Sequence, residues 1–182
     1  MKSVQSLPVR SVMDFLSLVK KRRSCRAFLP DPIDEQSLNA IVQAAQLAPS
    51  ACNLQPFKLH ILTGEALEKA RACAWLYQAP VAILVCTEDE KGWVRSHDGE
   101  NFALADAAIA VDHMALMAAS LDISSCIIGA IKLDPLVCAL QLPDNEHPQL
   151  ILALGKADAS AEDKVKLHDK RKSLEELVIR QA

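Results

Sequence analysis

Residues 102–121 read FALADAAIAVDHMALMAASL, a run of helix-forming residues with apolar side chains on almost every face. A helix that is apolar nearly all round must be covered by protein on most sides, so we expect it at the centre of the fold or in a subunit interface. Asp106, Asp112 and His113 lie within the run and disfavour a helix that crosses a lipid bilayer. This stretch therefore predicts a domain organised around one buried helix.

The run PVAILVC at residues 80–86 is short, continuous and apolar, which predicts a strand covered on both faces. Further elements are expected from alternation, helical periodicity, caps and proline stops. The expected strands are 57–61, 126–131 and 149–155, and the expected helices are 12–19 (capped by Ser11), 34–48, 67–76 and 134–142. Helices that alternate with about four strands predict an α+β fold around one central mixed sheet.

Chain length and the last segment bear on domain organisation. A chain of 182 residues fits one domain, residues 1–182. Residues 159–172 are polar and basic, and Ser173 and Glu176 have the spacing of a capping box that opens a final helix. We therefore expect residues 159–182 to form a C-terminal arm that leaves the body of the fold.

Composition disfavours several kinds of partner. The net charge of −3 and the 4% aromatic content argue against nucleic acid, and no segment predicts a membrane span. The six cysteines form no C-x-x-C pair, so we expect neither a disulfide framework nor a metal site. The first ten residues lack the apolar core of a signal peptide, so we expect a cytoplasmic protein.

The glycines exclude two common nucleotide sites. Only five are present, and no two lie close together. The Rossmann fingerprint and the P-loop both need clustered glycines to bring the backbone near phosphate, so neither is present. No spacing of a nucleophile and its base stands out either.

A basic cluster, RRSCR, occupies residues 22–26, where a helix is expected to end. The planar fork of arginine suits a phosphate dianion, and serine adds a neutral donor. Taken alone, the cluster is slightly better explained as a solvated helix end than as a phosphate site, because the helix macrodipole favours cations at the C-terminal end. A nucleic-acid-binding module that uses this cluster and the basic tail is an alternative that the acidic net charge disfavours.

A second polar segment, PSACNLQPF at residues 49–57, is a short loop bracketed by two prolines. Its asparagine and glutamine can present carboxamides to the polar edge of a heterocycle. By itself this loop is better explained as an ordinary capped loop.

In order along the chain, these segments resemble the short, single-domain members of the FMN-dependent nitroreductase family. The resemblance extends from about residue 20 to residue 178, nearly the whole chain. Its motifs are RRSCR (22–26), PSACNLQPF (49–57), DAAIA (106–110), DHMAL (112–116), CIIGA (126–130) and HDKRKSLEE (168–176). Asp122 and Ser124 stand where the family usually has glycines. The resemblance implies a three-layer nitroreductase-like fold and an intertwined homodimer with FMN at the subunit interface.

The resemblance also implies site residues. On the phosphate side, Arg22, Ser24 and Arg26 would hold the phosphate and ribityl chain, and Arg23 would add backbone contacts or charge. From the C-terminal arm, Arg171 would close over the phosphate, with His168 or Lys170 nearby.

On the ring side, one loop and one strand are implied. The loop would approach the isoalloxazine from the other subunit, and the strand would turn backbone N–H groups toward the N5–O4 edge of the flavin. The loop residues are Pro49, Ser50, Ala51, Asn53 and Gln55, and the strand residues are Ile127, Ile128 and Gly129.

The implied reaction is a ping-pong exchange with no catalytic side chain. A hydride from NADH or NADPH passes through flavin N5 to a nitroaromatic, quinone or similar acceptor. A flavoenzyme of the same fold with other chemistry, such as dehalogenation or flavin breakdown, is the alternative. The sequence leaves open the acceptor and any contribution of His113 or the 88–101 loop.

Overall fold

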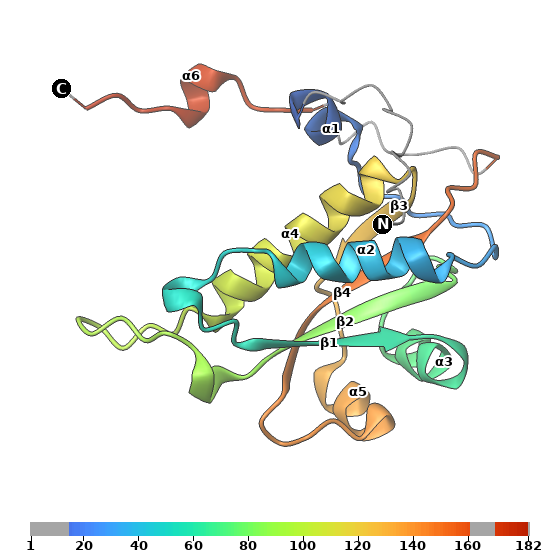
Figure 1. The fold of residues 1–182 in the computed structure, drawn as a ribbon, viewed down its shortest axis with the longest axis horizontal. Coiled ribbons are helices and arrows are strands. Elements are labelled where there is room, and N and C mark those ends of the chain that lie inside the picture. Colours follow the sequence, from blue (N-terminus) through green and yellow to red (C-terminus); the bar gives the residue numbers. More distant parts are fainter. Residues whose placement is uncertain (1–14, 161–169, 182) are drawn as a thin grey trace, which may run out of the picture.

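The structure is a computed structural model that describes residues 15–160 and 170–181 (Figure 1). A central sheet lies between two helical layers, with α2 and α4 on one face and α3 and α5 on the other. The predicted α+β class is confirmed, whereas Ser11 and Val12 of the first expected helix lie outside the described residues. The helices are α1 (Phe15–Lys21), α2 (Glu35–Gln46), α3 (Gly64–Cys73), α4 (Ala103–Ser120), α5 (Leu133–Leu140) and α6 (Leu174–Leu177). The strands are β1 (Phe57–Leu62), β2 (Val81–Thr87), β3 (Ser124–Ile128) and β4 (His147–Gly155), and two short 3-10 turns cover Ala51–Asn53 and Asp89–Lys91.

The sheet has the strand order β1-β2-β4-β3, and each neighbouring pair of these strands is antiparallel. The parallel component of the expected mixed sheet is limited, in the described part of the chain, to one isolated bridge between Ser24 and Ser125. β3 is therefore an edge strand of the sheet, and the segment after α1 lies along its outer side.

The centre of the sheet matches its sequence pattern. All seven residues of β2 are buried, as expected for a continuous apolar run with a covered face on each side. In β4 the last five residues, Ile151–Gly155, are buried next to it. These two strands form the core to which both helical layers attach.

The long apolar helix α4 occupies the central position expected for it. It packs against α2 and against β2, β3 and β4, and nine of its eighteen residues are buried. Leu104 and Ile109 remain 51% and 38% exposed. Among the described helices, only α4 is long and apolar enough to cross a membrane. Half of it is buried within the protein, as is typical of a core helix.

The neighbouring helix α2 begins where the sequence predicts. Asp34 is its N-cap, and the Asp34 carboxylate accepts a hydrogen bond from the Ser37 amide at 2.8 Å. This bond and the bond from the Ser37 hydroxyl lower the pKa of Asp34.

The chain from residue 24 to residue 29 crosses the end of the sheet where β3 begins and β4 ends. The Cys25 amide donates to Ser125 O at 2.8 Å, and the Leu29 amide donates to Lys156 O at 2.9 Å. Gly155 allows this crossing, because a Cβ there would lie 2.7 Å from Pro80 Cδ and 3.0 Å from Phe28 Cδ1. Residues 22–26 are therefore anchored by backbone bonds on both sides.

The described part of the C-terminal arm, residues 170–181, extends away from the sheet past α1 (Figure 1). Its short helix α6 has the predicted capping box, in which Ser173 Oγ accepts from the Glu176 amide and Glu176 accepts from the Ser173 amide. Every described residue of the arm is exposed, and Leu174, Leu177 and Ile179 are 73%, 62% and 84% exposed. The arm thus has no core of its own in this chain.

Candidate functional site

The basic cluster at residues 22–26 lies directly beside β3. Ser24 bridges Ser125, and Cys25 is buried against the sheet, whereas Arg23 and Arg26 are exposed. The sequence placed these residues about a hundred positions from the CIIGA strand. The structure brings the two segments together, as a site for one elongated ligand requires.

The charges around this cluster favour an anion. A hollow of about 170 Å³ is lined by side chains that include Lys21, Arg22 and Arg23 together with Ser124 and Ser125. Among the described residues, neither Arg23 nor Arg26 forms an ion pair with a carboxylate. Guanidinium groups without a carboxylate partner can bind phosphate without first breaking a salt bridge.

The pKa of the Cys126 thiol on β3 is affected by these cations. Burial raises the pKa of Cys126, and the positive charges of Arg26 and Arg22 oppose that rise. Both guanidinium groups therefore lie close enough to β3 to act on one buried group. A solvated helix end therefore explains the cluster only in part, because the cluster lies against β3 as well as solvent.

Asp122 follows the central helix at a position where the sequence resemblance leads us to expect a glycine. It has φ +60°, in the left-handed region that aspartate tolerates better than most residues. Its carboxylate accepts from Lys21 Nζ at 2.6 Å. The acidic side chain thus lies on the rim of the anion hollow but is balanced there by a lysine.

The CIIGA segment ends earlier as a strand than expected. β3 stops at Ile128, and Gly129 and Ala130 are exposed beyond it, whereas Ile131 bridges Ala74. Strand pairing with β4 also ends at Ile128, opposite Ile151. The open backbone at Gly129 is therefore free to face a ligand.

Gly129 is not required by packing within the chain. A Cβ at this position would meet only Leu150 Cδ2 at 3.7 Å, an ordinary contact, and Gly129 does not have a positive φ. Glycine here therefore fits a ligand that approaches the backbone closely.

If the ligand is the FMN that the sequence resemblance implies, we predict that Gly129→Ala weakens its binding by ~10-fold with little change in stability, since overpacking against a ligand costs ~1–3 kcal/mol. Flavin fluorescence titration and thermal melts of the flavin-free protein measure the two effects. A melting temperature that falls while FMN affinity stays constant would show that the glycine serves the fold instead.

The loop at residues 49–55 is held by internal hydrogen bonds and presents polar side chains. The Gln55 amide donates to Ser50 Oγ at 3.0 Å, and Gln55 Nε2 donates to Asn53 Oδ1 at 3.1 Å. Cys52, Asn53 and Gln55 all have positive φ, between 49° and 55°. Three left-handed residues without glycine store backbone strain of the kind found at ligand sites.

Asp106 holds this loop in place. Its Oδ1 accepts from the Ala51 amide at 3.0 Å, and the side chain is 3% exposed. Its Oδ2 is buried and has no hydrogen-bond partner among the described residues. In the sequence, Asp106 argued against a membrane span and belonged to the DAAIA motif, but it was assigned no role in the site; its signal was an acidic side chain among apolar residues in the first turn of a helix.

The two halves of the predicted site lie at opposite ends of α4. Asp106, which holds the loop, is in the first turn of α4, and Ala119, which lines the anion hollow, is in the last. Thirteen positions of helix separate them, about 20 Å at 1.5 Å per residue. The structure thus does not unite the arginine cluster and the Asn53 loop within one chain.

The remaining predicted residues are only partly placed. Arg171 is exposed on the arm, and His168 lies outside the described residues. His113 Nδ1 lies 3.0 Å from Ile109 O in its own helix, so its ring is engaged by the helix backbone.

Comparison with known proteins identifies this fold. A solved nitroreductase family protein from Clostridium difficile 630 superimposes with a TM-score of 0.87, is 32% identical, and covers 93% of this chain and 99% of its own. A nitroreductase with bound FMN from Bacteroides fragilis superimposes with a TM-score of 0.73 at 23% identity, covering 92% and 99%. An FMN reductase [NAD(P)H] from Bacillus subtilis is 28% identical over 162 residues, which is 76% of this chain and 64% of that protein.

These neighbours define a class of three-layer α+β proteins with the nitroreductase fold. The sequence model of the nitroreductase family matches residues 19–74 and 67–156, so the chain belongs to that family. The resemblance seen in the ordered motifs is thereby confirmed. The matches span less than two thirds of the length of the first curated relatives.

Proposed function

We propose that this protein is an FMN-dependent oxidoreductase that uses NADH or NADPH to reduce a nitroaromatic, quinone or similar small acceptor by a ping-pong mechanism. The observation that carries the proposal is the bond from the Cys25 amide to Ser125 O, which anchors the arginine cluster beside β3. The names of the B. subtilis relative and the B. fragilis structure support FMN as the cofactor.

The residues present fit this cofactor. A flavin mononucleotide needs a cationic pocket for its phosphate and an open backbone for its ring. The hollow at Arg22 and Arg23 with the nearby Arg26 meets the first need, and exposed Gly129, where a Cβ would fill space that a ligand can use, meets the second.

The protein would act on the reaction by binding and positioning. When bound, FMN supplies the redox chemistry at N5. The chain's own part is to hold the phosphate with Arg22, Ser24 and Arg26 and to orient backbone donors of Ile128 and Gly129 toward developing negative charge. No general base needs to be assigned, because orientation of donor and acceptor on one face is sufficient.

A second copy of the chain would complete each site. The Asn53 loop and the arginine cluster lie at opposite ends of α4 in one chain, so the loop of a partner chain would complete the flavin site at the cluster. Large apolar side chains are also exposed on the arm, on α1 and on the outer side of α4. On the arm they are Leu174, Leu177 and Ile179, on α1 Phe15 and Leu16, and on α4 Leu104 and Ile109. A homodimer would bury such a surface.

The compartment proposed is the cytoplasm. All six cysteines are free thiols, and four of them are buried. Unpaired thiols in this number are typical of a reducing environment.

The C-terminal arm should be needed for both dimerisation and cofactor binding. We predict that deletion of residues 169–182 lowers FMN affinity by at least ~10-fold and shifts the protein toward monomer, because it removes Arg171 and exposed apolar anchors together. Analytical ultracentrifugation and flavin titration measure the two effects. Full-length Arg171→Ala is the matched control: it should weaken FMN binding and leave the dimer intact.

The proposed activity is tested on full-length protein purified without added flavin. We expect a yellow protein with bound FMN, NADH or NADPH oxidation that depends on an added nitroaromatic or quinone, and parallel lines in double-reciprocal plots. A colourless protein that does not bind added FMN would overturn the proposal. Bound FMN without turnover of any acceptor would overturn the acceptor class alone.

A further inference from the structure

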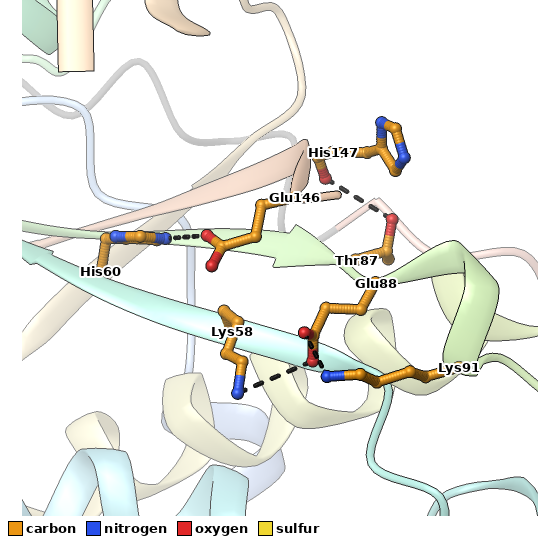
Figure 2. Close-up of polar contacts among 7 residues, drawn as sticks. All are labelled: Lys58, His60, Thr87, Glu88, Lys91, Glu146 and His147. Carbon is orange, nitrogen blue, oxygen red and sulfur yellow. Dashed lines mark hydrogen bonds and ion pairs between the residues drawn. The ribbon is translucent and has the colours of Figure 1, made fainter. Parts of the chain in front are cut away.

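Three metal-ligating side chains meet on the sheet face opposite α4. His60 lies on β1, Cys86 on β2, and Glu146 in the turn just before β4. Their ligand atoms all lie within 4.8 Å of one another, and His60 Nε2 is 2.5 Å from Glu146 Oε2. Figure 2 shows the His60 ring and the Glu146 carboxylate directed at each other across the sheet.

Strand register explains why residues so distant in sequence converge. Lys58 pairs with Cys86 and His60 pairs with Leu84, so residues 60 and 86 face the same side of the sheet. The pairing of β2 with β4 is irregular between Val85 and Cys86, and Glu146 enters from the turn at this point. Sequence spacing could not show the cluster, because it depends on which strands are neighbours.

We propose that His60, Cys86 and Glu146 bind one zinc ion, with a solvent molecule in the fourth position. Imidazole nitrogen, thiolate sulfur and carboxylate oxygen are the three ligand types that Zn²⁺ uses, and three protein ligands plus an open position is an established arrangement. The site is inside the protein yet reachable: Cys86 is fully buried, and the side chains of Glu146 and His60 are 11% and 32% exposed.

Charge balance supports a divalent ion here. Zinc binding would release the Cys86 thiol proton to solvent and leave a thiolate. One Zn²⁺, one thiolate and one carboxylate then sum to zero, which removes the cost of a buried net charge.

The nearest other charged groups do not compete for the ion. Glu88 is buried but is engaged by Lys91 at 2.6 Å and by Lys58 at 3.7 Å, and the hydrogen bond from Lys91 is the main cause of its lowered pKa. Figure 2 shows this group apart from the His60–Glu146 pair. Lys58, which is opposite Cys86 in register, thus has its ammonium directed to Glu88.

The alternative is that His60 and Glu146 form only a hydrogen-bonded pair and Cys86 only fills the core, as buried cysteines often do. A bound zinc would instead clamp β1, β2 and the turn before β4, and so stabilise the folded state. The arginine cluster and Gly129 lie beside β3, away from these three ligands, so we expect zinc binding to leave the flavin site unchanged.

Zinc chloride is the probe, titrated into chelator-treated, full-length, flavin-loaded protein in competition with a chromophoric chelator. We expect one zinc per chain and a higher melting temperature with an unchanged flavin spectrum. Cys86→Ala and Glu146→Gln should each weaken zinc binding by at least ~10-fold. Glu146→Gln keeps a hydrogen bond to His60, so it serves as the test if Cys86→Ala does not fold.

Cys73→Ala is the matched control. Cys73 is a buried cysteine in the same apolar cluster, on α3, without the histidine and glutamate. This variant should bind zinc as the unchanged protein does. Absence of one-to-one binding, equal binding in all variants, or an equal loss in Cys73→Ala would each overturn the zinc site.

Discussion

Arg26→Ala is expected to weaken FMN binding by ~10–100-fold, because a charge-assisted hydrogen bond to phosphate contributes ~1.5–3 kcal/mol. Arg26 is exposed and has no carboxylate partner among the described residues, so its loss leaves no buried group unpaired. Riboflavin, which lacks the phosphate, should bind the variant and the unchanged protein equally. Fluorescence titration with each flavin measures the difference.

A matched control separates this local effect from net charge. Lys69→Ala removes one exposed cation from α3, on the other face of the sheet, where Lys69 pairs with Glu65. It should leave FMN affinity unchanged. Equal losses for FMN and riboflavin in Arg26→Ala, or no loss for either, would remove the phosphate from the proposed site.

Mixed dimers of Arg26→Ala and Asn53→Ala should regain up to about half the activity of the unchanged dimer, as two-fold symmetry requires. The arginine cluster and the loop around Asn53 lie at opposite ends of α4, so we expect them to serve different flavins. In the mixed dimer, one site then carries both lesions and the other carries none. Activity after subunit exchange, with heterodimers counted by mass spectrometry, measures the rescue.

The reciprocal pairing sharpens the test. A chain with both substitutions, paired with an unchanged chain, would place one lesion in each shared site and leave no site intact. If one chain alone built each flavin site, the outcomes would reverse: the double variant would show half activity and the separate variants none. That reversal would contradict the shared site while leaving the phosphate cluster possible.

Local signals predicted most of the elements correctly. Asp34 begins α2, the run from residue 80 becomes the buried strand β2, and Ser173 opens α6 with its capping box. Each of these depends on a cap or on periodicity within a few residues. The end of the CIIGA strand was less well predicted, because β3 stops where β4 ceases to pair with it, at Ile128.

The site was predicted in pieces rather than as a whole. Residue type and motif order were enough to predict the arginine cluster and the strand beside it as parts of the site. The family assignment is confirmed. Asp106, which holds the Asn53 loop, and the His60–Cys86–Glu146 cluster were missed. Asp106 had only the signal of an acid in an apolar helix, and the cluster has no local spacing that distinguishes it from ordinary core or surface residues.

The sequence by itself determined the class of fold, the buried central helix and the family, because hydrophobic period, caps and motif order are properties of neighbouring residues. Only the tertiary structure decided that Ser24 lies against Ser125 and that Ala51 is held at the far end of α4. These contacts follow from strand order and from the length of one helix. Both are set by packing between segments far apart in the chain, where local propensity carries no information.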